Sequence, residues 1–163
     1  MFRHPRLLIV LTNIVVSFVL GCTTLPSRTV VFEGTAMLPG IKSGTRLPVL
    51  MLTPQSKTQL KRGDIVVFRH PEDPAKQFIQ RLIGLPGDTV TISSGDVWIN
   101  DVQLQEPYID ARLNVSKRSL PSMEVPRNSY FLMADNRDNA ADSRIWGFVP
   151  EDHVIAKVDQ AKR

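Results

Sequence analysis

The residues of this 163-residue chain that could carry chemistry include two hydroxyls close to a lysine, Thr35, Lys42 and Ser43. A hydroxyl attacks a carbonyl carbon only if a neighbouring group accepts its proton, and a lysine does so near neutral pH only where burial lowers its pKa. Lys42 lies in a loop flanked by glycine and serine, which offers little burial. The three residues could supply a nucleophile and a base, but the loop does not favour that chemistry.

The segment FIQRLIG, residues 78–84, places one amide among apolar side chains. An extended chain sends alternate side chains to opposite faces, so Gln80 shares a face with Phe78 and Leu82. Arg81 can reach water past its apolar stem, whereas the shorter glutamine needs a hydrogen-bond partner wherever it is buried. The sequence therefore predicts a buried, hydrogen-bonded amide at position 80.

Metal and phosphate chemistry have little support. His4, His70 and His153 are far apart and Cys22 is the only cysteine, so no metal-binding spacing occurs. In residues 84–88, GLPGD, a proline stands where a phosphate cradle needs a free N–H, and the segment suits a tight turn. We expect no metal and no cofactor.

The elements that must position these residues are short extended runs separated by turn residues, without a long amphipathic helical period. This pattern predicts a mainly β chain forming a single domain. The predicted strands are residues 29–33, 47–52, 64–69, 77–83, 88–93, 97–99, 129–133 and 154–158, and the chain turns again at Asn100-Asp101 into residues 102–104.

The clearest strand pair surrounds the turn Ser94-Gly95-Asp96. Val90 and Ile92 alternate with polar residues before the turn, and Val97 and Ile99 do so after it. Period-two alternation across such a turn predicts a β-hairpin.

Two further segments have less distinct patterns. Residues 47–52, LPVLML, are either a core strand or an exposed apolar patch that rests on a membrane, and the core is favoured. Pro48 favours an edge strand because proline cannot donate a backbone hydrogen bond. Residues 107–127 are polar and irregular, which predicts a surface loop.

The charge pattern argues against nucleic-acid binding. The net charge is +4, and roughly +2 without Arg3 and Arg6, which lie in a terminal segment expected to be removed. The remaining basic pairs are isolated and have no interleaved aromatic residues, so we expect no nucleic-acid partner.

The N-terminus reads as an export signal. A basic start precedes a mainly apolar run over residues 7–21, which is shorter than the roughly 20 residues of a membrane span, although a retained anchor remains an alternative. The run ends in Val19-Leu20-Gly21-Cys22, which resembles the lipobox of bacterial lipoproteins, cut before a lipid-carrying cysteine. Lipidation would explain the unpaired thiol of Cys22, which is otherwise an inert cysteine.

These features predict a domain organisation and a location. Residues 1–21 form a signal peptide or membrane anchor, residues 22–28 a linker and residues 29–163 one domain. We expect the domain to be held at a membrane, on its periplasmic or extracytoplasmic side, through lipidated Cys22 or the anchor.

Four segments together resemble the bacterial signal peptidase I family: EGTAMLPG at 33–40, KRGDIVVF at 61–68, FIQRLIGLPGDTVTI at 78–92 and ADNRDNAADSRIWGFVP at 134–150. The resemblance runs from about residue 30 to residue 156. It implies a β-rich fold shared with self-cleaving repressor proteins. It also implies a serine nucleophile, a lysine general base, and exported preprotein substrates with small residues one and three positions before the cut.

At the three positions that the resemblance assigns to chemistry, this sequence departs from the family. Ala36 stands at the nucleophile position before Met37, Gln80 at the base position, and Ala140 where a serine orients the lysine. An alanine offers no hydroxyl, and a carboxamide takes up no proton at physiological pH.

The resemblance also assigns an oxyanion-binding position and supporting residues. Gly34 occupies a place where some members use a serine hydroxyl and others have glycine, beside Ala36. Asp142 and Arg144 are expected to pair with each other or with the backbone. The residues that support the site are Met37, Pro39, Arg81, Asp138, Asp142 and Arg144.

Our leading interpretation is a pseudopeptidase that binds an extended exported peptide with small residues by adding it to a strand edge. One alternative is an active peptidase that uses Thr35 or Ser43 with Lys42 or a water-relayed group. Another is a structural lipoprotein without a peptide ligand. A conjugation-type maturation peptidase or a repressor relative fits less well, because residues 136–147 match signal peptidases better and no DNA-binding helix pair precedes them.

Overall fold

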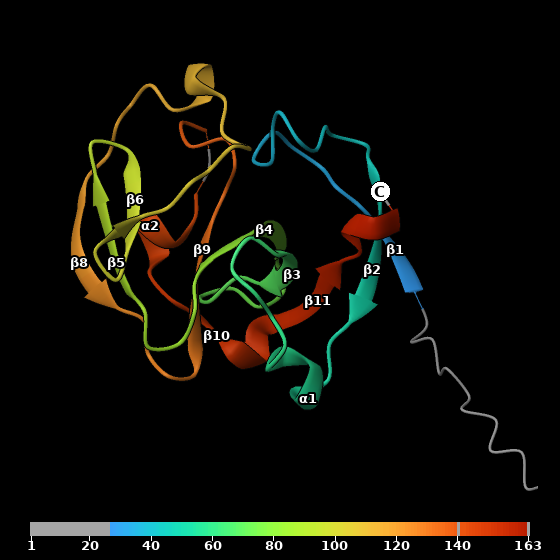
Figure 1. Ribbon diagram of the computed structural model, residues 1–163. Helices are drawn as coiled ribbons and strands as arrows, with labels where there is room; N and C mark the ends of the chain where they lie inside the picture. Colours follow the sequence, from blue (N-terminus) through green and yellow to red (C-terminus); the bar gives the residue numbers. More distant parts are fainter. Residues whose placement is uncertain (1–26, 140, 163) are drawn as a thin grey trace, which may run out of the picture.

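The computed structural model describes residues 27–139 and 141–162 (Figure 1). The segments expected to form the signal peptide and most of the linker, with Cys22, lie outside these residues, as does Ala140. Within the described part, strands in two antiparallel sheets predominate and helices are short, so the predicted mainly β class is confirmed.

The larger sheet has seven strands, and each pairs antiparallel with its neighbours. Their order is β1 (Ser27–Val31), β2 (Arg46–Met51), β11 (Val154–Val158), β3 (Ile65–Arg69), β4 (Gln77–Gly84), β9 (Ser129–Met133) and β10 (Val149–Pro150). Since four antiparallel steps separate β1 from β4, these two strands run in the same direction.

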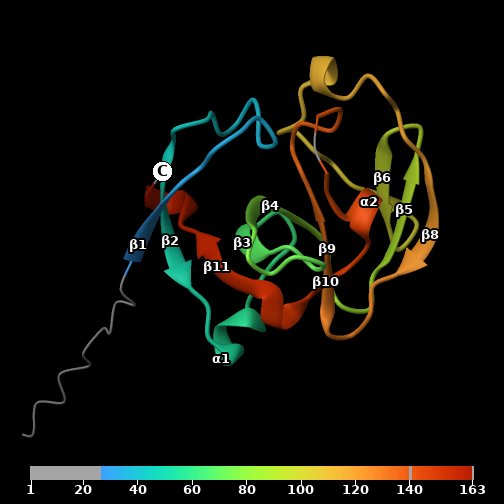
Figure 2. The same cartoon turned by 180° about the vertical axis from the view of Figure 1, so that it is seen from behind.

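The smaller sheet lies at one end of the molecule and the β1–β2 pair at the other, with β3 and β4 between them (Figures 1 and 2). Its order is β7 (Val102–Gln103), β6 (Asp96–Ile99), β5 (Thr89–Ser93) and β8 (Leu120–Glu124). The helical turns are α1 (Pro54–Lys57), η1 (Ala111–Leu113), α2 (Ser143–Trp146), η2 (Glu151–His153) and η3 (Gln160–Lys162).

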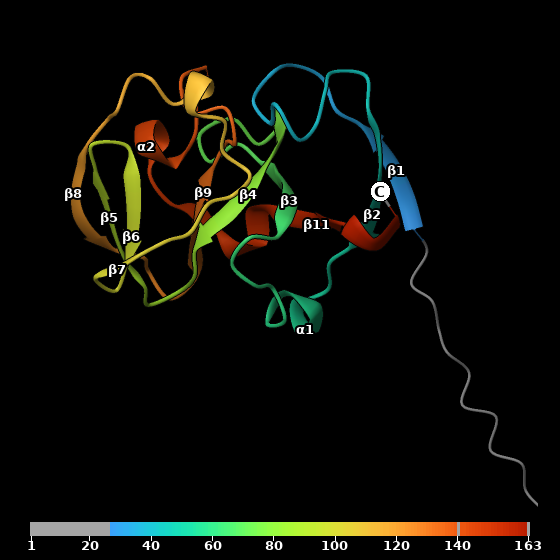
Figure 3. The same ribbon diagram turned by 45° about the horizontal axis from the view of Figure 1, so that its top comes forward.

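Alternation along the strands divides the core among three clusters. On β3, Val67 joins a cluster on one face of the larger sheet, whereas Val66 and Phe68 join a second on the other face. A third cluster packs Phe131 of the larger sheet against Ile92 of the smaller one. Figure 3 shows β4 lying between the smaller sheet and the β1–β2 pair. This strand contributes one buried residue to each cluster, Ile79, Leu82 and Ile83 in turn.

The predicted hairpin is confirmed in register. Val90 pairs with Ile99 and Ile92 with Val97. Ser94 and Gly95 have φ values of 49° and 86°, which is the backbone of the two-residue turn whose twist matches a hairpin.

Two predictions from the sequence are wrong. Strand β2 is not an edge strand, since it lies between β1 and β11. Pro48 has no backbone N–H to donate, but it lies just beyond the last β2–β11 pair, where the sheet loses no bond. The Pro48 carbonyl still accepts a hydrogen bond from Asp159 N at 2.8 Å. The predicted loop over residues 107–127 contains β8, whose alternation is hidden by a proline and exposed polar residues.

The favoured core interpretation of LPVLML is confirmed, because Leu47 and Val49 are fully buried. No helix among residues 27–139 and 141–162 is long and apolar enough to cross a membrane.

Candidate functional site

The first half of β4 has one edge that pairs with no other strand of the described sheet. Strand β3 pairs with residues 77–81 on one side, but β9 pairs on the other side only from Arg81 to Gly84. Leu82 exchanges backbone hydrogen bonds with Gly63 and Asp64 on the β3 side. Because these groups alternate along a strand, the backbone N–H and C=O of Ile79 face the open edge.

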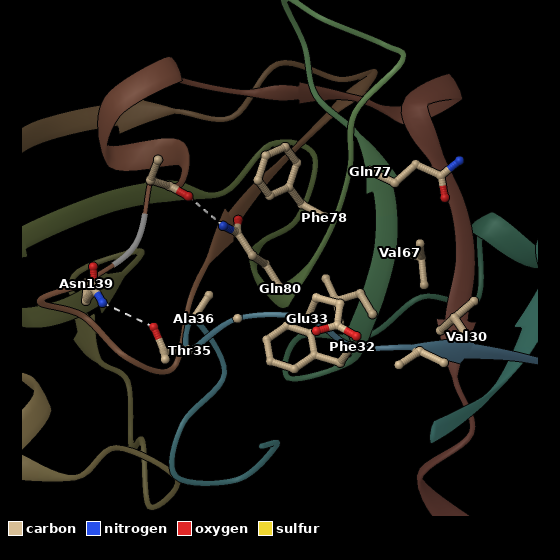
Figure 4. A pocket seen from close by; sticks show the side chains of 14 residues that line it. Val30, Phe32, Glu33, Thr35, Ala36, Val67, Gln77, Phe78, Gln80 and Asn139 are labelled. Atoms are coloured by element: carbon tan, nitrogen blue, oxygen red, sulfur yellow. Dashed lines mark hydrogen bonds between the residues drawn. The ribbon is translucent and has the colours of Figure 1, made fainter. Parts of the chain in front are cut away.

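Residues 30–36 form the opposite wall of a groove along this edge (Figure 4). Phe32 is fixed by two backbone bonds, from its N to Thr45 O and from Gly44 N to its O. Alternation then turns the backbone groups of Val31 away from β2. The groove encloses about 470 Å³, and its lining residues are Val30, Val31, Phe32, Glu33, Gly34, Thr35, Ala36, Val67, Gln77, Phe78, Ile79, Gln80, Asn139 and Ala141.

Gln80 and Ala36 both line this groove, although they come from distant parts of the chain. Gln80 is 1% exposed, and its Nε2 donates to Ala141 O at 2.7 Å. Its Oε1 is buried and has no hydrogen-bond partner in the described part of the chain. The predicted buried, hydrogen-bonded amide is therefore confirmed for the nitrogen, while the oxygen is left unpaired.

The loop that carries Ala36 is tied to residues 136–139. Asn136 N donates to Ala36 O at 2.9 Å, and Asn136 Nδ2 donates to Thr35 O at 3.2 Å. Asn139 Nδ2 donates to Thr35 Oγ1 at 3.1 Å. Neither asparagine was singled out from the sequence, where only their place in the run DNRDN could have drawn attention to them.

Of the residues proposed for the alternative chemistry, Thr35, Ser43 and Lys42, only Thr35 lines the groove. Thr35 lines the groove, where its hydroxyl accepts a bond from Asn139, and an amide donor is not a general base. Ser43 Oγ accepts from Gly34 N at 3.1 Å and donates to Glu33 Oε2 at 3.2 Å. Lys42 is exposed, lines a different hollow and does not line the groove.

Gly34, at the oxyanion position, has a φ of 108°. This backbone conformation strains any residue with a Cβ atom. The local geometry therefore favours glycine over serine here.

Arg81 is held by a buried ion pair, which corrects the expectation that its charged end reaches water. Its Nε and Nη2 donate to the two oxygens of Asp135 at 2.8 and 2.6 Å, and its Nη1 donates to Gly63 O. The guanidinium also lies 3.8 Å from the centre of the Tyr108 ring. Burial is the largest single influence and lowers the pKa of Arg81, but Asp135, Tyr108 and Glu106 together outweigh it, so the pKa is raised.

The segment that receives Gln80 is stabilised by the expected Asp142–Arg144 pair. Arg144 Nε and Nη2 donate to Asp142 Oδ1 and Oδ2 at 2.8 and 2.7 Å. Asp142 also caps α2 through Arg144 N and accepts from Ala134 N. These bonds hold the backbone that follows Ala141.

The remaining supporting residues fix the surrounding loops. Asp138 accepts from Val115 N and Ser116 N at 2.7 and 2.9 Å, and the Ser116 hydroxyl bond is the main reason that its pKa is lowered. Met37 is fully buried, and a cis peptide bond joins Leu38 to Pro39.

Comparisons with known proteins agree with this architecture. Residues 6–161 match the family described as signal peptidase, peptidase S26. The chain is 39% identical over 127 residues to "Probable signal peptidase I-1" of Synechocystis sp., an alignment that covers 74% of this chain and 63% of that protein. It is 35% identical to signal peptidase I of Leptolyngbya laminosa, with coverage of 85% and 70%, and 36% identical to signal peptidase I U of Bacillus subtilis, with 76% and 68%.

A solved structure gives the same result. The crystal structure of a signal peptidase I from Enterococcus faecalis superposes with a TM-score of 0.53 at 35% identity, covering 58% of this chain and 92% of that one. Fold and groove thus define a signal peptidase I-like protein. The chain belongs to the signal peptidase, peptidase S26 family. It spans less than two thirds of the Synechocystis relative's length.

Proposed function

We propose that this chain is a signal peptidase I-like pseudopeptidase, which binds an extended exported peptide without cleaving it. The observation that carries the proposal is the pairing of Gln80 Nε2 with Ala141 O in a groove whose facing residue is Ala36. A carboxamide that donates to a carbonyl is not a base, and a methyl group is not a nucleophile.

The proposed loss of peptidase activity follows from the way in which the three catalytic groups depend on one another. Nucleophile, base and orienting hydroxyl work as a unit, so the loss of one removes nearly all of the rate advantage and the others become free to change. A lysine at a position that is 1% exposed also carries a desolvation cost. Glutamine at position 80 avoids that cost.

The retained groove supports binding. The open edge of β4 presents the backbone groups of Ile79 to the wall formed by residues 30–36. An extended peptide can add to such an edge through main-chain hydrogen bonds, with shallow pockets selecting side chains. The floor beside Ala36 and Gly34 is suited to small residues.

Membrane association agrees with membership of this family. The finer proposal, attachment on the extracytoplasmic side through lipidated Cys22, rests on the Val19-Leu20-Gly21-Cys22 sequence.

The first prediction compares the full-length protein with the triple variant Ala36→Ser, Gln80→Lys, Ala140→Ser. Both are incubated in neutral detergent with a labelled exported-protein peptide that bears Ala-x-Ala; binding is followed by fluorescence anisotropy and cleavage by mass spectrometry. We expect the natural protein to bind without cutting and the triple variant to cut at the second alanine, because it restores all three groups at once. The double variant Ala36→Ser, Ala140→Ser lacks the base and should remain inactive.

The same assay separates the alternatives. Cleavage by the natural protein would overturn the proposal, and loss of that cleavage in Thr35→Val would identify the substitute nucleophile. An absence of peptide binding to the natural protein would favour the structural lipoprotein instead.

A further inference from the structure

A second hollow continues the groove away from Ala36. It encloses about 480 Å³ and shares Val30, Val67 and Gln77 with the groove as lining residues. Its floor is apolar and includes Val49 and Ala156 of the larger sheet. The two hollows therefore form one continuous depression between the β1 segment and the middle of the sheet.

The second hollow differs from the groove in charge. Its lining includes three basic side chains, Arg28, Lys57 and Arg69, and one acidic side chain, Asp152. Arg28 and Arg69 are exposed, and Lys57 Nζ donates to a backbone carbonyl, Glu151 O, at 2.7 Å. None of the three cations forms an ion pair with a carboxylate in the described part of the chain. Their positive charge is thus available to a ligand.

We infer that the second hollow binds an acidic segment of the same extended peptide whose small residues lie against Ala36. The inference rests on the proposed function, because it assigns a further specificity to the same ligand. Val30 and Arg28 precede Ala36 by about six and eight residues, so an added strand reaches the basic rim after roughly that number of residues. The ligand class is therefore an extended peptide with acidic residues about six to eight positions from its small ones.

A peptide fits this surface better than the alternatives. The apolar floor continues from the strand-adding edge of β4, which is the shape that one extended chain needs. A basic segment such as the chain's own start, with Arg3 and Arg6, would be repelled by the three cations. An anionic lipid surface could bind the same three cations, but it would not require that the second hollow adjoin the groove.

The experiment measures binding of labelled peptides of equal length to the full-length protein in neutral detergent by fluorescence anisotropy. One peptide carries Ala-x-Ala with two aspartates six and eight positions before the second alanine, another carries them after it, and further peptides carry asparagine or lysine at those positions. We expect aspartates on one side to lower the Kd about three- to tenfold relative to asparagine, as exposed ion pairs allow, and lysines to raise it. The gain should shrink as salt is raised.

Variants test the location. Arg28→Gln with Arg69→Gln should abolish the gain from aspartate while leaving the Kd of the asparagine peptide unchanged. Lys42→Gln, which removes an exposed cation outside both hollows, is the matched control and should preserve the gain.

The outcomes distinguish this inference from the proposed function. If the asparagine peptide binds and aspartate adds nothing, or if Lys42→Gln removes the gain equally, the acidic specificity is wrong and the peptide-binding function stands. If no peptide binds, the proposed function fails. If the peptides show no gain but Arg28→Gln with Arg69→Gln reduces binding to anionic vesicles, the cations serve a lipid surface, which overturns the inference.

Discussion

Gln80 uses only part of the hydrogen-bonding capacity of its side chain. Its amide nitrogen binds Ala141 O, whereas its oxygen is buried without a partner among the described residues. A buried unsatisfied acceptor costs about 1–3 kcal/mol, which is comparable to what one hydrogen bond contributes. The side chain is therefore explained better by its position in the site than by a contribution to stability.

The second prediction concerns the environment of position 80. Gln80→Lys should unfold more easily than the natural protein at pH 7, because burial disfavours the ammonium and lowers the pKa of the introduced amine. The unfolded state then binds more protons than the folded state, so the variant should gain stability as pH rises from 7 towards 10, by about 1.4 kcal/mol for each unit of lowering. Urea unfolding at several pH values measures this.

Gln80→Met is the control, since it has similar length and no titrating group. Its stability relative to the natural protein should not change between pH 7 and 10. If the lysine variant shows the same flat profile, position 80 does not lower an amine's pKa, and a lysine there could not act as a base.

Single residues were predictable where local pattern decides. Alternation correctly placed Gln80 beside Phe78 and Leu82, and the expected Asp142–Arg144 pair is two residues apart. The partner of Arg81 was not predictable, because Asp135 lies 54 residues away and only the folded sheet brings the two together.

At the scale of elements, β4 decides the architecture of the site. Its first half is open on one edge and forms the groove, whereas its second half pairs with β9 and meets the smaller sheet. The register between β4 and β9 shifts between Leu82 and Gly84, where the strand bends towards that sheet.

The third prediction concerns Gly84. A Cβ atom added there would lie 2.8 Å from Phe131 Cβ, 2.8 Å from Val90 Cγ2 and 2.9 Å from Val125 Cγ2. Phe131 Cβ cannot rotate away, so Gly84→Ala should overpack the junction and lower the free energy of unfolding by about 1–3 kcal/mol. Urea denaturation followed by fluorescence measures the change.

The matched control is Ser93→Ala, at an exposed position of β5, which should shift the transition little. An equal effect of the two substitutions would show that the space around Gly84 relaxes without cost.

Elements with strong alternation were predicted to within about two residues of their ends, which is the usual uncertainty of strand boundaries. Strand β8 was missed because Pro121 and exposed residues conceal its pattern, and β10 because it has two residues. Pro48 led to the wrong prediction of an edge strand, because the fold places it at the end of the β2–β11 pairing inside the sheet.

At the scale of the whole molecule, Asp88 joins the two sheets. Its carboxylate accepts from Arg62 Nη1 at 3.1 Å, from Leu85 N at 2.6 Å and from Asn100 Nδ2 at 3.0 Å. Burial, the largest single influence, raises the pKa of Asp88, but these bonds together outweigh it and leave the pKa below its ordinary value.

The fourth prediction follows from this shift. A carboxyl group whose folded pKa is depressed stabilises the fold above its unfolded pKa of about 3.9, and this contribution is lost as pH falls through the folded pKa. Asp88→Asn should therefore be less stable by about 1–3 kcal/mol at pH 7, and the difference should narrow below about pH 4. Thermal melting from pH 7 to pH 3 checks this, and a constant difference would contradict it.

The groove could not be predicted from the sequence alone. Its walls come from residues 30–36 and 77–80, and their approach depends on long-range pairing through β2, β11 and β3. Only the resemblance of separate segments to one family indicated that Ala36 and Gln80 would share a site.

The second wall of the groove has a further consequence for the open edge of β4. If a strand from another folded protein paired with β4, the next strand of that protein's sheet would lie about 4.8 Å further out. Residues 30–36, which form the opposite wall of the groove, already occupy that space. Under the proposed function, this edge would therefore take a lone extended chain and exclude the paired edge of another folded protein. A newly made exported chain would then be bound only before its own sheets form.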